Sequence, residues 1–474
     1  MDIGICSVLS IIAIFLPLFY ALYLFGARLS LSFVPKKVLN SGCFVVNLIS
    51  FVLFLLLKIP FINKTGVVEY DFNFFSIEKF SLNFGFSIDE TNISYLIIAS
   101  LLCWVISLYS KYYFDIKKQF IFTKQRYYVF LALISFLTYA FLASSNLFEG
   151  VIALMLQSYL IAVFAYYDIF KYPKNYNVSR FHRISLLGNF SLLVSAMILF
   201  RYAILSQGYI ASNSINYSEL NVLMSYTWGI SGSIEFKIMV ICLIVAIMSR
   251  LMIFPMSCYY SFFANSSNIM YLSVIGIVNN ISGMFLYLKV IPLIQLFKNY
   301  ILIFEILIIL GALVSLIQIL FERNIKIVFG YLLSAINSIF VILFLFFNVG
   351  LIQNIYFAFN LIFVALLMIL FINDKNNFKK RLINRQIGFA LEKSHIVLFE
   401  VVPQKISLVF DVLDEKVIQK ITALLVAIFN YFISLFVVKT TKTTKIKNIR
   451  NILLIIIFFI LLAIFATLFG DLIW

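Results

Sequence analysis

Long apolar runs separated by short polar stretches dominate this chain. A helix needs about 20 mostly apolar residues to cross the hydrocarbon core of a bilayer. The sequence predicts twelve such helices, roughly over residues 4–25, 42–62, 92–110, 127–145, 147–168, 183–203, 236–256, 268–292, 300–321, 327–349, 352–372 and 450–470. No small-residue cleavage site follows the first run, so we expect it to be a span and not a removable signal peptide.

Three regions depart from this pattern. Residues 63–88 alternate apolar and polar side chains, which predicts a β-hairpin or extended loop outside the membrane. Residues 373–391 are basic, and we expect them to form a solvated linker. Residues 404–438 begin amphipathic and become uniformly apolar. One interpretation is that they lie along the bilayer surface or pack on a partner. The other is that they contain a thirteenth span near 421–438.

The composition is that of a membrane protein. Hydrophobic residues make up 63% of the chain and charged residues 12%, whereas a soluble domain has about 25% charged residues. The net charge is +16, and the Lys and Arg residues lie mostly between apolar runs. A positive-inside bias places them there, so this charge is expected to meet membrane lipids and does not indicate nucleic-acid binding. Abundant Phe, Ile, Asn and Lys have AT-rich codons, which fits a mitochondrial or reduced bacterial genome.

No soluble catalytic domain is predicted. The sequence has no glycine-rich dinucleotide or phosphate loop, no HExxH and no nucleophile elbow. Its five cysteines are far apart and form no CxxC, and it has only two histidines. These features predict no cofactor, no metal site and no disulfide framework in this chain. Any chemistry is therefore expected to be transport.

One cation stands out within an apolar run. Arg250 lies in the segment Phe236–Pro255, FKIMVICLIVAIMSRLMIFP. An ionisable residue at membrane depth is a candidate functional site, because burying charge in lipid is costly. The other interpretation is that Arg250 lies near a surface and snorkels to it. Pro255 is expected to interrupt the helix.

Six motifs, in order over residues 85–372, carry a resemblance to a known family. The first, SIDETNISYLIIASLLCWVISLYSKYYF, resembles an Asp-Gly-Leu-Ser opening followed by an apolar run ending Leu-Tyr-Ser-x-x-Tyr. The others are QSYLIAVFAYY (157–167), LLGNFSLLVS (186–195), SRLMIFP (249–255), NNISGMFLYLK (279–289) and ERNIKIVFGYLLS (322–334). Together they resemble the antiporter-like subunits of NADH:ubiquinone oxidoreductase, respiratory complex I, and most of all its distal subunit.

The resemblance implies a fold. It is an all-α polytopic membrane protein with inverted five-helix repeats, each containing a broken helix, and a C-terminal amphipathic lateral helix. The breaks are expected near Pro255 and around Phe359. The implied parts are N-terminal spans and an extramembrane loop (1–90), a first repeat (91–256), a second repeat (257–372), a basic linker with the lateral helix (373–449) and an anchoring helix (450–474).

The departures from the family concern its proton channel. The family uses a Glu on the fifth helix, where this chain has Ile152, although Glu149 lies one turn earlier. Arg250 falls on the lysine of the first broken helix. Apolar or neutral residues occupy three further positions that are charged or protonatable in the family, namely Ile275, Val364 and Asn189.

The proton-pathway candidates are therefore Arg250, Glu149 and Lys326. A guanidinium stays charged in proteins, so Arg250 cannot switch protonation as a lysine can. It can hold a fixed charge, pair with Glu149 or repel cations. Either protons still cross, with Glu149 titrating and Arg250 modulating it, or the channel is lost and the chain is a structural remnant. Lys326 begins a span and is either a surface charge or a relay residue.

The resemblance also implies partners and a location. The partners are other complex I membrane-arm subunits, especially the neighbouring antiporter-like subunit, and the flavin and iron–sulfur clusters belong to other chains. The location is the inner mitochondrial membrane or a bacterial inner membrane. Two alternatives remain: a subunit of an Mrp-type Na⁺/H⁺ antiporter, which shares these motifs, and an unrelated multipass transporter.

Overall fold

A computed structural model gives the structure of this chain. It divides into two units, Met1–Lys375 and Asn376–Trp474. The structure describes residues 3–29, 34, 36–63, 68–77, 80–117, 121–168, 176–205, 217, 234–253, 256, 268–295, 298–321, 325–346 and 349–373. The predicted linker at 373–391, apart from its first residue, the amphipathic segment at 404–438 and the last span at 450–470 lie outside the described residues, and they stay predictions.

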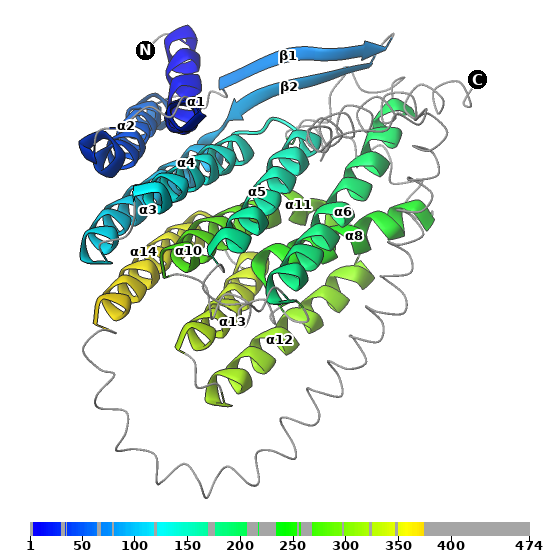
Figure 1. The fold of residues 1–474 in the computed structure, drawn as a ribbon. Helices are drawn as coiled ribbons and strands as arrows, with labels where there is room; N and C mark the ends of the chain where they lie inside the picture. Colours follow the sequence, from blue (N-terminus) through cyan, green and yellow to red (C-terminus); the bar gives the residue numbers. More distant parts are fainter. Residues whose placement is uncertain are drawn as a thin grey trace, which may run out of the picture. The chain divides into compact units, whose positions relative to one another are not determined.

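The described part of the first unit is a bundle of long helices (Figure 1). The helices are α1 (Ile3–Leu29), α2 (Lys36–Asn63), α3 (Glu90–Lys117), α4 (Ile121–Leu142), α5 (Leu147–Asp168), α6 (Tyr176–Leu205), α8 (Ile234–Leu251), α10 (Asn268–Ser273), α11 (Gly283–Gln295), α12 (Lys298–Phe321), α13 (Ile325–Phe346) and α14 (Val349–Asn373). A π-helical segment, η4 (Val274–Ser282), joins α10 to α11, so these three form one continuous helical run.

Ten helices of the described part are long and apolar enough to cross a membrane. They correspond to ten of the twelve predicted spans, so the chain is an all-α polytopic membrane protein. The predicted span at 236–256 is shorter in the structure, because α8 has 18 residues and ends at Leu251. This helix is not among the ten, since it carries three charged residues, Glu235, Lys237 and Arg250.

The hairpin predicted from residues 63–88 is present. Strands β1 (Val68–Ile77) and β2 (Phe80–Ile88) pair antiparallel. The end of β2 also binds the turn between α4 and α5, where the Ser87 N–H donates to the Ala143 carbonyl at 2.9 Å. The hairpin is therefore fastened to the helix bundle by backbone hydrogen bonds, which need no particular side chains.

Asp89 joins this end of the hairpin to two helices. One carboxylate oxygen accepts a hydrogen bond from the Asn92 N–H at 2.6 Å and caps α3. The other accepts from Lys289 Nζ of α11 at 2.7 Å. Burial alone would raise the pKa of the Asp89 carboxyl, but the Lys289 ammonium and the hydrogen bonds hold that pKa below its usual value.

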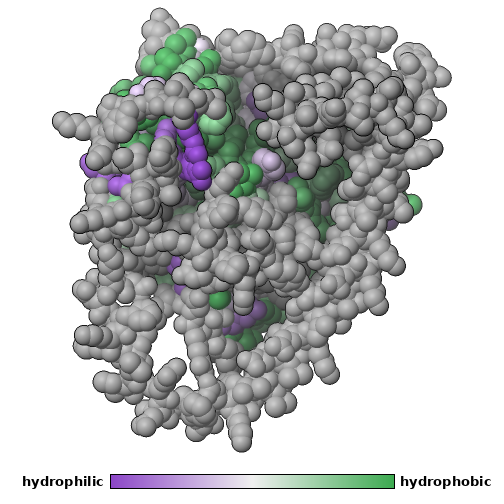
Figure 2. Space-filling view, viewed as in Figure 1, coloured by the Kyte–Doolittle hydropathy of each residue, from purple (hydrophilic) through white to green (hydrophobic). Residues whose placement is uncertain are grey.

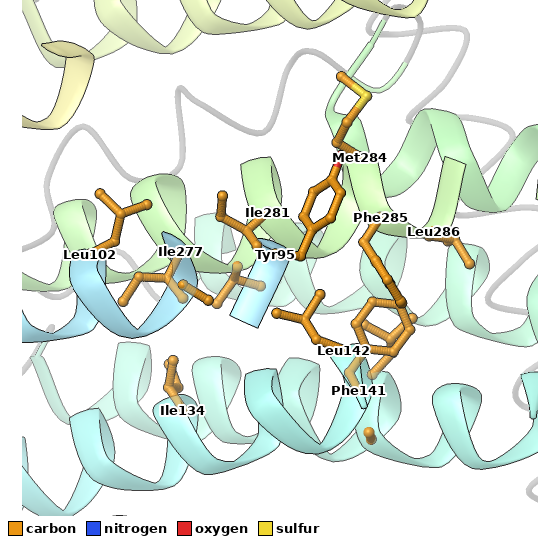
Figure 3. Close-up of a cluster of buried hydrophobic side chains, with 14 of the residues drawn as sticks. Tyr95, Leu102, Ile134, Phe141, Leu142, Ile277, Ile281, Met284, Phe285 and Leu286 are labelled. Carbon is orange, nitrogen blue, oxygen red and sulfur yellow. The ribbon is translucent and has the colours of Figure 1, made fainter. Parts of the chain in front are cut away.

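The helices enclose a tightly packed apolar core. Figure 3 shows part of it, where side chains of α3, α4, η4 and α11 meet. The ring of Phe285 contacts Tyr95 and Phe141 edge-on, with centroids 5.4 Å apart in both pairs. Other apolar residues face outward, and Figure 2 shows such hydrophobic residues at the surface of the described part. Outward apolar faces are what a lipid environment requires.

Of the two expected helix breaks, the described residues contain one. Helix α8 ends at Leu251, four residues before Pro255. The next residue, Met252, has a positive φ of 53°. The break expected around Phe359 is absent, and that prediction is wrong. Helix α14 is continuous from Val349 to Asn373 because its sequence has no proline and no glycine beyond its first turn. The paired repeats at 91–256 and 257–372 stay a prediction.

Candidate functional site

Arg250 is the penultimate residue of helix α8 and is only 6% exposed. The helix cannot continue far beyond it, because Pro255 has no N–H to donate and Met252 is in the left-handed region. The interpretation that Arg250 snorkels to a membrane surface does not fit this burial. The side chain instead points into a group of polar residues from other helices.

The guanidinium is held by neutral groups of α5 and α6. Arg250 Nη2 donates to the Leu154 carbonyl (2.7 Å), to Ser158 Oγ (2.9 Å) and to Asn189 Oδ1 (2.5 Å), and Nη1 lies 3.4 Å from Gln157 Oε1. All of these bonds are buried. These bonds fix the cation in place. Each acceptor is an uncharged amide, hydroxyl or carbonyl, which does not take up a proton near neutral pH.

The same acceptors bind one another and reach a third helix. Asn189 Nδ2 donates to Ser158 Oγ at 3.0 Å. Gln157 Nε2 donates to Thr138 Oγ1 of α4 at 3.0 Å. We call Thr138, Gln157, Ser158, Asn189 and Arg250 the arginine cluster. It is continuous from α4 to α8 and has no carboxylate or histidine among its members.

Close packing of α6 on α8 sets up this cluster. A Cβ atom added at Gly188 would lie 2.5 Å from Ser249 Cβ, so only glycine allows the two helices to approach this closely. The Ser249 hydroxyl donates to the Ile184 carbonyl at 3.3 Å. Gly188 therefore brings Asn189 and Arg250, the next residue on each helix, within hydrogen-bond distance.

A second polar group receives the broken end of α8. The Ser334 hydroxyl donates to the Met252 carbonyl at 2.7 Å, and Asn337 Nδ2 donates to the Leu251 carbonyl at 3.2 Å. Asn337 Nδ2 also lies 3.2 Å from Asn280 Oδ1. Asn280 Nδ2 in turn donates to Asn360 Oδ1 at 2.5 Å. These bonds satisfy carbonyls that lose their helical donors at the break.

We call Asn280, Asn337, Asn360 and Tyr356 the asparagine cluster. The Tyr356 hydroxyl donates to the Asn280 carbonyl at 2.9 Å and completes the group. Each of the four side chains is 0% exposed. With the arginine cluster it forms a buried polar line from α4 to α14, and amide and hydroxyl groups dominate that line. Amides do not change protonation near neutral pH, so they cannot act as proton-switching relay groups.

Glu149 lies in the first turn of α5. Its carboxylate accepts hydrogen bonds from the Ser145 N–H (3.1 Å) and hydroxyl (3.3 Å), while its own N–H donates to Asn146 Oδ1 (2.8 Å). The Asn146 side chain thus caps the start of α5, and the Glu149 carboxylate binds back to Ser145, the residue before this cap. The guanidinium binds α5 at Leu154 and beyond, about 7 Å or more farther along the helix at 1.5 Å per residue. The contacts with Ser145 and Asn146 hold Glu149 at the start of α5, and its pairing with Arg250 stays a prediction.

Lys326 lies in the first turn of α13 and is half-buried. Its carbonyl accepts a hydrogen bond from the Tyr271 hydroxyl of α10. It begins the apolar span Lys326–Phe346, so it lies at the end of that span and not at its centre. The two apolar residues at protonatable family positions, Ile275 and Val364, are buried and 1% exposed or less.

Sequence reasoning missed Gln157 and the asparagine cluster. A signal was present for two of them, because Gln157 and Asn337 are each the lone amide of an otherwise apolar helix. Asn280 follows Asn279, and Asn360 shares its helix with other amides. Asn is abundant throughout this sequence, which hid that signal. Among the described residues, no group of three or more His, Cys, Asp or Glu side chains could hold a metal ion.

Comparison with solved structures finds a respiratory membrane protein of similar fold. It is a chain in the structure of the membrane-bound sulfane sulfur reductase, an archaeal respiratory membrane complex, with a TM-score of 0.52 and 12% sequence identity. The match covers 70% of this chain and 63% of that one, so this chain spans less than two thirds of its structural relative. No protein-family model and no curated protein matches. The likeness is one of fold.

Proposed function

We propose that this chain is a membrane-arm subunit of a respiratory complex related to complex I, with a degenerate proton channel and a largely structural role. Two independent lines support the assembly. The six motifs resemble the antiporter-like subunits of complex I, and the fold is similar to that of a chain in an archaeal respiratory membrane complex. Within this proposal the chain corresponds to the distal subunit, subunit 5 of the mitochondrial enzyme.

The observation that carries the structural role is the buried Arg250 with its neutral partners. A proton relay needs groups that gain and lose protons near neutral pH, and a buried lysine does so because burial lowers its pKa. Arginine remains charged under the same conditions. The guanidinium, with hydrogen bonds to α5 and α6, acts as a fixed connector between helices. The whole complex would still couple electron transfer to proton translocation through its other subunits.

Isolation of the intact assembly tests the proposed partners. Membranes solubilised in mild detergent would be separated by native electrophoresis and stained for NADH dehydrogenase activity. We expect this chain to migrate with the active band, together with another antiporter-like subunit. Migration of the chain alone would contradict the proposal, and migration with Na⁺/H⁺ antiporter subunits would favour the Mrp-type alternative.

The number of protons pumped per electron tests the degenerate channel. We expect complexes carrying Glu149→Gln to pump as many protons per electron as the wild type, because the Glu149 carboxylate binds Ser145 at the start of its own helix. The matched control is the same substitution at Glu235, an exposed carboxylate paired with Arg201. If Glu149→Gln alone lowers the number of protons pumped per electron, this chain conducts protons and the proposed structural role is contradicted.

A further inference from the structure

Another ionisable residue lies within a predicted span, on helix α12. Glu305 is the sole charged residue of the span Tyr300–Ile319. It is five residues past Tyr300, about 7.5 Å along the helix. Residues 300–321 were predicted as a plain apolar span, so this carboxylate adds a chemical group that the rest of the helix lacks.

Helix α12 is covered less by the rest of the chain than any other of the ten spans. Its outward residues recur every three or four positions and form one continuous apolar face, which we call the α12 stripe: Leu302, Ile303, Ile306, Ile309, Leu310, Leu313, Leu316 and Ile317. At 100° per residue, Glu305 lies at one edge of this stripe and is half-buried. It therefore borders whatever lies against the stripe.

Nothing in the described part of the chain satisfies this carboxylate. No hydrogen bond or ion pair joins Glu305 to another described residue. Tyr287 of α11 lies close enough to interact with it electrostatically. The Tyr287 hydroxyl, however, donates to the Val341 carbonyl at 3.1 Å and is not available to the acid.

A charged group at membrane depth is costly unless it is paired, and such residues mark functional or pairing sites by default. We propose that the α12 stripe is the docking face for a transmembrane helix of a neighbouring subunit, which places a Lys or Arg side chain against Glu305. A long cationic side chain reaches an acid at this depth, whereas a lipid amine stays at the headgroup level. The apolar stripe matches the three- and four-residue spacing of a packed helix. The inference rests on the proposed function only in requiring a neighbouring subunit.

Cross-linking in native membranes tests the partner's identity. A photoreactive amino acid would replace Leu302 or Ile309, which flank Glu305 on the stripe, in the full chain within its assembly. We expect mass spectrometry to map the cross-link to a transmembrane segment of another subunit that contains a Lys or Arg. Adding Glu305→Gln should reduce the cross-link yield by about an order of magnitude. The control Glu235→Gln should leave the yield unchanged.

A charge exchange then tests the chemistry. Glu305→Lys should prevent association, and replacing the mapped cation by Glu in the partner should restore it. Cross-links only to lipid, to residues 376–474 of this chain, or to a segment without Lys or Arg would each overturn the inference. If the wild-type chain enters the active band but shows no partner cross-link, the inference alone fails. If the wild-type chain never enters that band, the proposed function fails first.

Discussion

Replacing Arg250 by methionine should destabilise the helix bundle. The substitution removes the guanidinium and leaves two buried amide oxygens, Gln157 Oε1 and Asn189 Oδ1, without the donor that they have now. An orphaned buried acceptor costs about 1–3 kcal/mol. Relief from burying a charge offsets part of this loss. We therefore expect the free energy of unfolding to fall by about 2–4 kcal/mol.

The measurement is unfolding of the purified full-length chain in mixed micelles, followed by fluorescence. The matched control is Arg201→Met, because Arg201 pairs with Glu235 across a surface where both side chains are about half exposed (55% and 42%). That pair should contribute less than about 1 kcal/mol. A variant Arg250→Met as stable as Arg201→Met would refute the connector role.

A double-mutant cycle separates the direct bond from general damage to the core. Arg250→Met and Asn189→Leu remove the two ends of the 2.5 Å hydrogen bond. Residues in direct contact usually show a coupling energy of about 0.5–3 kcal/mol. If the two losses instead add within about 0.3–0.5 kcal/mol, the bond is not what stabilises this site.

Three further outcomes are expected. Asn337→Leu should lower stability by about 1–3 kcal/mol, measured in the same micelles, because it uncaps the end of α8. Gly188→Ala should lower the thermal midpoint, since the new Cβ would lie 2.5 Å from Ser249 Cβ, and adding Ser249→Gly should restore it. The pKa of Asp89 is lowered in the folded state. The contribution of Asp89 to the free energy of unfolding should therefore be complete above the unfolded pKa of about 3.9. It should be lost as pH falls through the lower folded pKa. Asp89→Asn should remove that pH dependence of the free energy of unfolding. A variant with the same pH dependence as the wild type would contradict this prediction.

Local pattern was enough for most of the fold. The ten membrane helices and the hairpin follow from runs of apolar residues and from alternation, because each depends on neighbours within a few positions in sequence. The end of α8 near Pro255 is local in the same way. The expected break around Phe359 failed because it came from resemblance, while the local sequence of α14 contains nothing that ends a helix.

The sequence by itself determined that Arg250 would be a cation in an apolar helix close to its end. Only the tertiary structure decided that its partners include Leu154, Ser158 and Asn189, between 61 and 96 positions away. The physical reason is range. Hydropathy and helix termini are set by adjacent residues, whereas the partner of a buried polar group depends on which helices pack together and in which register.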